Sequence, residues 1–192
     1  MPIQILDIGP DRLPEYSRVP SRFIVRSILQ PDPPGGSLCG IPLHEVPVPA
    51  SWSKDYDSYG ELPTDWPRLF DVTHWAFLLA LNEAQTPLGA AAVAFDTPGL
   101  DMLERRRDLT VLWDIRVSPQ ARGLGIPLFR RAAAWSREHG CHQMKVETQN
   151  VNLPACRFYQ RMGCELGQIH RFAYASTLAV RDEIMLCWYL RL

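Results

Sequence analysis

Two glycines, two residues apart, precede a predicted helix in the stretch Ser118-Pro-Gln-Ala-Arg-Gly-Leu-Gly125. The first N–H groups of a helix have no partners within the helix, and the helix dipole is positive there. Glycines in the turn before such a helix let an anion approach the main chain directly. The spacing predicts a phosphate-binding turn, although an ordinary connector that needs positive φ would use the same residues.

Two common phosphate motifs do not fit this turn. No Gly-Lys-Ser/Thr follows it, as a P-loop requires, and Leu128 stands where a dinucleotide-binding Gly-x-Gly-x-x-Gly has its third glycine. Pro127 is compatible with a helix start, because its missing N–H would have no partner there.

The strand that leads into the turn is predicted over residues 109–117, where the hydrophobic residues alternate. One face is expected to carry Val111, Trp113, Ile115 and Val117, and the other face Leu112, Asp114 and Arg116.

After the turn, a helix is predicted over residues 127–138, with Leu128, Ala132 and Trp135 on one stripe and Gly140 at its end. A strand at 143–148 follows. Asn152 then caps a second helix whose stripe is Ala155, Phe158, Tyr159 and Met162, closed by Gly163. Further strands are predicted at 22–29, 183–192 and, as a hairpin with a turn at 82–85, at 75–81 and 88–95. These elements predict an α+β fold, a mixed and mostly antiparallel sheet flanked by helices.

Composition favours one globular domain over residues 1–192. The chain has 192 residues, 46% hydrophobic and 21% charged, with a formal net charge of -1. Such a charge gives no reason to expect nucleic acid or an anionic membrane as partner, so a small molecule is the expected ligand. No stretch is long and apolar enough for a membrane span, and no secretory leader is evident, so a cytoplasmic location is expected.

The cysteines and histidines do not predict a metal site. Five cysteines are scattered without a Cys-x-x-Cys pair, and the neighbours His139 and His142 lack a partner at ligand spacing. We therefore expect reduced thiols and no metal.

Prolines and glycines crowd residues 31–70, which predicts a loop insertion. Its aromatic and acidic residues could form a lid over a cationic ligand, or the aromatics could only anchor a solvated insertion. These residues are Trp52, Asp55, Tyr56, Asp57, Tyr59, Glu61, Asp65 and Trp66.

Two motifs resemble those of the GNAT N-acetyltransferase superfamily. Gln120-Ala-Arg-Gly-Leu-Gly125 is similar to its Gln/Arg-x-x-Gly-x-Gly/Ala motif, which wraps the pyrophosphate of acetyl-CoA. Asn152, Ala155, Tyr159 and Gly163 match the Asn-x-x-Ala-x-x-x-Tyr-x-x-x-Gly helix beside the cofactor thiol. The resemblance covers about residues 109–167. Where this chain has Pro127, many relatives carry glycine.

The resemblance implies a GNAT fold with acetyl-CoA as co-substrate. The residues implied in cofactor binding are Ile115, Arg116, Val117, Gln120, Ala121, Arg122, Gly123, Leu124, Gly125, Ile126, Asn152, Ala155 and Tyr159.

Acetylation of an amine requires a neutral nitrogen, yet only about one alkylamine molecule in a thousand is in the neutral form at pH 7. Asp114 and Glu147 are the carboxylates expected to hold the ammonium and accept its proton, although Asp114 could instead pair with Arg116. The resemblance implies Tyr159 as the acid for the leaving thiolate and a main-chain N–H near Val117 as the oxyanion donor.

The stretches around residues 111–117, 143–167 and 182–190 look like those of streptothricin acetyltransferases. This likeness implies a small cationic primary amine as acceptor and antibiotic inactivation as the function. A polyamine, an aminoglycoside or a protein amino terminus remains an alternative acceptor. A non-catalytic acyl-CoA sensor is the alternative from another class. Cys156 and Cys164 are expected to be buried rather than nucleophilic, and the protein is expected to be a monomer or a homodimer.

Overall fold

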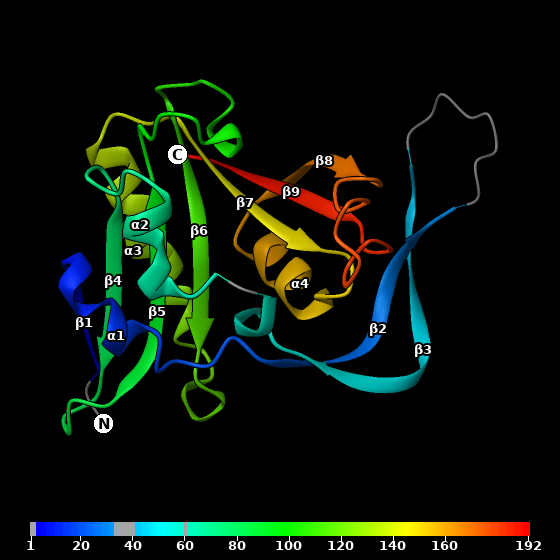
Figure 1. Cartoon of the computed structure of the whole chain (residues 1–192), viewed down its shortest axis with the longest axis horizontal. Helices are drawn as coiled ribbons and strands as arrows, with labels where there is room; N and C mark the ends of the chain where they lie inside the picture. Colours follow the sequence, from blue (N-terminus) through cyan, green and yellow to red (C-terminus); the bar gives the residue numbers. More distant parts are fainter. Residues whose placement is uncertain (1–2, 33–40, 60) are drawn as a thin grey trace. The chain divides into compact units, whose positions relative to one another are not determined.

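The structure is a computed structural model that describes residues 3–32, 41–59 and 61–192 (Figure 1). The chain forms two compact units. The first contains Met1–Ser21, Tyr56–Val146 and Tyr189–Leu192, and the second contains Arg22–Asp55 and Glu147–Trp188.

Among the described residues, the first unit contains four complete strands and three α-helices. Its elements are β1 (Gln4–Ile8), η1 (Pro10–Arg12), α1 (Leu13–Tyr16), η2 (Tyr56–Tyr59), η3 (Pro63–Asp65), α2 (Trp66–Leu69), β4 (Ala76–Leu81), β5 (Pro87–Ala94), η4 (Asp101–Leu103), β6 (Leu109–Val117), η5 (Pro119–Ala121) and α3 (Gly125–Glu138). The second unit contains β2 (Phe23–Pro31), β3 (Leu43–Lys54), α4 (Leu153–Arg161) and β8 (Glu165–His170), while β7 (Gln143–Gln149) and β9 (Met185–Arg191) have residues in both.

Seven strands are hydrogen-bonded in the order β1-β4-β5-β6-β7-β9-β8, and β2 pairs with β3 in a separate two-stranded sheet. The pairs β1–β4, β4–β5 and β5–β6 are antiparallel, and β6–β7 is parallel. The sheet is therefore mixed and mostly antiparallel, as predicted.

The two faces of β5 are covered by different helices. Ala90, Ala92 and Ala94 lie on the face of an aromatic core cluster that includes Tyr16 of α1 and Trp66 of α2. The small alanines leave room for these rings, and Trp66 stacks on Phe77 with ring centroids 6.1 Å apart. Gly89 belongs to the opposite face, where an added Cβ would lie 2.8 Å from Leu124 and 2.9 Å from Leu128.

The predicted alternation of β6 is wrong after Trp113. Ala92 pairs with Asp114 but Val93 pairs with Leu112, so Trp113 is an extra residue in β6, a β-bulge. An extra residue reverses the side-chain alternation that follows it. Asp114 and Arg116 therefore share the aromatic face with Val111, whereas Ile115 and Val117 share the α3 face with Leu112.

The prediction of a loop over residues 31–70 is also wrong in part. Leu43–Lys54 is strand β3, and Trp66 begins α2 with its side chain buried in the aromatic core. Residues 33–40 and Gly60 lie outside the described residues. Pro47 and Pro49 lie in a strand at the edge of a two-stranded ribbon, where a missing N–H is tolerated.

The remaining predicted elements are present with shifted ends, and some were missed. α4 (Leu153–Arg161) buries Leu153, Cys156 and Tyr159, so only Tyr159 of the predicted stripe is fully buried. α3 begins at Gly125 rather than at Pro127, and its buried stripe consists of Leu128, Phe129, Ala132, Ala133 and Ser136 instead of including Trp135. β1, α1 and β8 were not predicted. Within the described part of the chain, no helix has the length and apolar character needed to cross a membrane.

Candidate functional site

The glycine turn lies in the first unit, between β6 and α3. Gly123 has φ +96°, which side-chain-bearing residues rarely adopt, and an added Cβ there would meet no atom within 4 Å. Leu124 is buried against β5 at Gly89, while Gln120, Arg122 and Gly123 are exposed. Leu124 therefore anchors the turn on β5, and the other side of the turn is exposed to solvent.

Main-chain hydrogen bonding leaves three N–H groups of this turn available. Ala121, Leu124 and Ile126 donate to carbonyl groups within the turn, at 2.9, 3.1 and 3.2 Å. Among the described residues, the N–H groups of Arg122, Gly123 and Gly125 donate no main-chain hydrogen bond. Unpaired donors beside a helix start are the arrangement that binds phosphate.

We expect Gly123→Ala to weaken acetyl-CoA binding about tenfold, because a residue with a Cβ would shift the turn away from positive φ. Gly140→Ala is the matched control, since Gly140 has φ +75° and open space but lies at the other end of α3. Calorimetric titration with acetyl-CoA checks this. Equal affinities of the two variants would count against the turn as the cofactor site.

The end of β6 directs alternate main-chain groups to opposite sides. The N–H of Ser118 donates to the carbonyl oxygen of Leu88 in β5 at 2.8 Å. Successive residues of a strand point their N–H groups to opposite neighbours, so Val117 directs its N–H away from β5. Among the described residues, β6 pairs with β7 from Leu109 to Leu112. The Val117 N–H therefore points away from β5.

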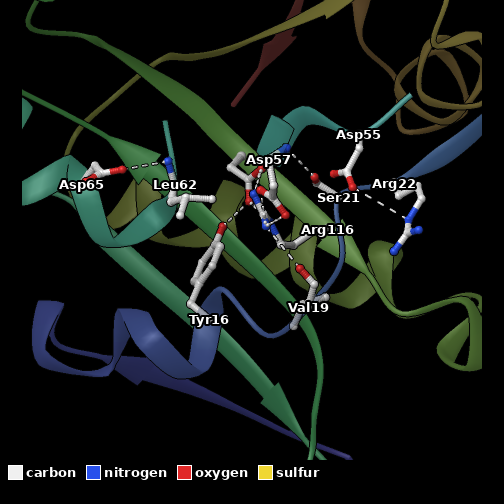
Figure 2. A network of polar contacts seen from close by, with 10 residues as sticks. Tyr16, Val19, Ser21, Arg22, Asp55, Asp57, Leu62, Asp65 and Arg116 are labelled. Atoms are coloured by element: carbon white, nitrogen blue, oxygen red, sulfur yellow. Dashed lines mark hydrogen bonds and ion pairs between the residues drawn. The ribbon is translucent and has the colours of Figure 1, made fainter. Parts of the chain in front are cut away.

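Asp114 and Arg116 form the centre of a polar network in the first unit. Arg116 donates from Nε to Oδ2 of Asp114 at 2.8 Å and from Nη2 to Oδ1 at 3.2 Å. Its Nη1 donates to Asp57 Oδ1 at 3.0 Å and to the carbonyl oxygen of Val19 at 3.2 Å. Figure 2 shows Tyr16, Val19 and Asp57 around the Arg116 side chain. The alternative that Asp114 pairs with Arg116 is thus confirmed.

The Arg116 side chain is only 4% exposed. Burial alone would lower the pKa of Arg116, but the charge and hydrogen bonds of Asp114, with Tyr16 and Asp57 nearby, raise that pKa above its usual value. The guanidinium stays charged and all three of its nitrogens are engaged, so this side chain is occupied by acidic partners rather than held out toward a phosphate.

Tyr16 was missed by the sequence analysis. Its side chain is fully buried, and its hydroxyl donates to Asp114 Oδ2 at 2.5 Å. The Arg116 guanidinium carbon also lies 5.5 Å from the Tyr16 ring centroid. Tyr16 and Asp114 are 98 residues apart, and nothing in the local pattern of residues 13–16 indicates this contact.

The second unit holds the other group of predicted residues. Asn152 accepts a hydrogen bond from the Ala155 N–H at 3.2 Å and so caps α4, as predicted. Tyr159 is buried on the inner stripe of α4 with Leu153 and Cys156, and Gly163 ends the helix with φ +87°. The capped helix fixes the position of Tyr159 within its unit.

Glu147, also in the second unit, is half-buried and bonded to two side chains. The Tyr174 hydroxyl donates to Glu147 Oε1 at 2.5 Å, and Gln149 Nε2 donates to Tyr174 at 3.0 Å and to Glu147 at 3.4 Å. Tyr174 is the second polar partner that sequence reasoning missed, since it lies in the loop before β9. The predicted residues thus form two groups, one with Asp114 and the glycine turn and one with Glu147 and Tyr159, each inside its own unit.

Cys156 and Cys164 are buried, and burial raises the pKa of both to about 12. The thiolate is the reactive form, so these cysteines are poor nucleophiles at neutral pH. With Cys39→Ser, which removes the cysteine outside the described residues, we expect Ellman's reagent at pH 8 to label the folded protein about 100-fold more slowly than the unfolded protein. Rapid labelling of one thiol in the folded protein would contradict this. No group of three metal-ligating side chains occurs among the residues that the structure describes.

Comparison with known proteins identifies the family of this chain. The chain matches the model of the acetyltransferase (GNAT) family over residues 42–164, more than half of its length. It is 34% identical to a streptothricin acetyltransferase of Escherichia coli over 84 residues, which are 43% of this chain and 48% of that protein. It is 48% identical to a streptothricin acetyltransferase of Streptomyces lavendulae over 74 residues, 38% of this chain and 39% of that protein.

The chain spans less than half the length of these two relatives. A solved structure from Bacillus anthracis strain Ames, assigned as a streptothricin acetyltransferase in complex with acetyl coenzyme A, has a TM-score of 0.76 at 22% identity and covers 100% of both chains. This likeness shows the fold, which is the α+β GNAT fold predicted from the sequence. With the match of the family model, it shows that the chain belongs to the GNAT family of acetyltransferases.

Proposed function

We propose that this acetyltransferase uses acetyl-CoA to acetylate a primary amine of a small cationic acceptor, in the manner of a streptothricin acetyltransferase. The observation that carries the proposal is the turn at Arg122–Gly125, which leads into the 14-residue helix α3 and has three N–H groups with no acceptor among the described residues. An anion such as the pyrophosphate of acetyl-CoA would supply the missing acceptors.

The cofactor side of the proposed site uses main chain more than side chains. The N–H groups of Arg122, Gly123 and Gly125 hold the pyrophosphate, and Gln120, Ala121, Leu124 and Ile126 shape the turn. Ile115 and Val117, whose main-chain groups point away from β5, face the thioester end. Arg116 belongs to the acceptor side instead, because Asp114 and Asp57 already take its donors. Asn152 and Ala155 form the α4 start that presents Tyr159.

When bound, acetyl-CoA supplies a thioester carbonyl that an amine can attack. Asp114 binds the acceptor ammonium, and Glu147 takes the proton that the nitrogen loses, directly or through a water molecule. The Val117 N–H stabilises the oxyanion. Tyr159 donates a proton to the departing thiolate sulfur. A new C–N bond replaces the C–S bond, and the acetyl group reaches the amine without a covalent enzyme intermediate.

A panel assay tests this function. The protein is incubated with acetyl-CoA and either streptothricin, spermidine, an aminoglycoside or a peptide with a free amino terminus, and products are identified by mass spectrometry while free thiol is followed. We expect streptothricin to have the highest kcat/KM. Faster transfer to another amine would overturn the proposal that streptothricin is the acceptor. Binding of acetyl-CoA without transfer to any amine would overturn the proposal that the acceptor is an amine.

A further inference from the structure

Tyr16 differs from the other rings of the aromatic core because its hydroxyl is bonded to a carboxylate. Tyr16 packs edge-on to Trp66 with centroids 5.5 Å apart, so its ring fills the core like its neighbours. Its hydroxyl, however, reaches Asp114 on β6 at 2.5 Å. A phenylalanine would fill the same space without burying a hydroxyl group. The hydroxyl therefore needs an explanation other than packing.

The hydrogen bonds divide unequally between the two oxygens of Asp114. Oδ2 accepts from the Tyr16 hydroxyl at 2.5 Å and from Arg116 Nε at 2.8 Å. Oδ1 accepts from Arg116 Nη2 at the longer distance of 3.2 Å. Because each carboxylate oxygen has two lone pairs, Oδ2 is saturated and Oδ1 keeps capacity for another donor. The side chain of Asp114 is 17% exposed, so part of it is accessible to solvent.

We propose that Tyr16 is a positioning residue for the acceptor amine: by occupying Oδ2 of Asp114 it fixes the carboxylate so that Oδ1 receives the acceptor ammonium. This inference rests on the proposed function, in which Asp114 binds that ammonium. The fixed rotamer lowers the entropy that the carboxylate loses on binding the acceptor. Tyr16 acts through Asp114 and does not contact the acceptor itself.

The charge of the surrounding network fits a cationic acceptor. Asp114 and Asp57 both pair with Arg116, which gives two carboxylates for one guanidinium. The ammonium group of an alkylammonium would bring a second positive charge to this pair of carboxylates. Arg116 binds both oxygens of Asp114 and the Tyr16 hydroxyl binds one of them, so these two partners together restrict rotation of the carboxylate.

Tyr16 itself stays a hydrogen-bond donor throughout the working pH range. Burial raises the pKa of Tyr16 well above its usual value, and the charge of Asp114 adds to this effect. Neither an acid nor a base role at neutral pH suits such a group. Its removal should therefore change the binding of the acceptor more than the rate of the chemical step.

Tyr16→Phe tests the inference, since it removes the hydroxyl and keeps the ring. With the best amine of the panel, we expect KM for that amine to rise about tenfold, whereas kcat and KM for acetyl-CoA stay within about twofold. Tyr189→Phe is the matched control, because it also removes a tyrosine-to-carboxylate hydrogen bond, to Glu104 at 2.6 Å, outside the proposed site. Melting temperatures of both variants are measured alongside.

A second comparison separates a positioning role from general stabilisation. In an Asp114→Ala background, Tyr16→Phe should raise the amine KM no further, because Tyr16 acts through that carboxylate. An unchanged amine KM in Tyr16→Phe would overturn the inference. The same rise in amine KM in the Asp114→Ala background as in the wild-type background would also overturn it. In both cases, turnover by the wild type would leave the proposed function intact. A wild-type protein that acetylates no amine would overturn both.

Discussion

Tyr159→Phe should lower kcat about 100-fold, which is a usual loss when a general acid is removed. The affinity for acetyl-CoA should stay within about twofold of the wild-type value. The reason is the leaving group. A thiol has a reference pKa of about 8.5 and a tyrosine about 10, so proton donation is uphill by about 2 kcal/mol, a modest part of a chemical barrier. The hydroxyl is nevertheless useful because it delivers the proton where the C–S bond breaks.

The position of Tyr159 makes this test clean. Tyr159 is a buried residue, 4% exposed, on a helix capped by Asn152, so phenylalanine retains the packing of the ring. Rapid-quench measurement of a single turnover isolates the chemical step, and the same Tyr189→Phe variant controls for loss of a tyrosine hydroxyl elsewhere. A single-turnover rate within threefold of the wild type, which is about 0.7 kcal/mol, would remove Tyr159 from the mechanism.

Arg116→Met should destabilise the protein by about 3 kcal/mol, because removing one partner of a buried ion pair leaves the other charges uncompensated. The carboxylates left behind are those of Asp114 and Asp57, whose side chains are 17% and 25% exposed. The carbonyl of Val19 also loses its donor. The free energy of unfolding, measured in urea at neutral pH, reports this loss.

The control for this variant is Arg131→Met. Arg131 also bridges two carboxylates, Asp7 and Glu138, but its side chain is 33% exposed, and surface pairs contribute about 0–1 kcal/mol. Arg116→Lys should give an intermediate loss, since lysine retains the charge without the planar fork that reaches both acids. Equal losses for Arg116→Met and Arg131→Met would show that the network contributes little to stability.

Elements specified by a few neighbouring residues were predicted well. Gly123, Gly140 and Gly163 all have positive φ, and the Asn152 side chain caps α4. The hairpin of β4 and β5 and the strand β6 also follow from hydrophobic patterns within single segments. The geometry in these cases depends on residues three or four positions apart, so the sequence contains the information directly.

The sequence by itself thus determined the turn that could bind phosphate, the capped helix of Tyr159 and the family of the chain. Only the tertiary structure decided how Asp114 is held. The bulge at Trp113 turns Asp114 and Arg116 toward the aromatic core, and a bulge depends on the register of the partner strand rather than on the alternation of β6 alone. Tyr16 and Asp57 reach this pair from segments 98 and 59 residues away from their partners. Contacts over such separations arise from the packing of whole elements, because no local pattern constrains which side chains meet across them.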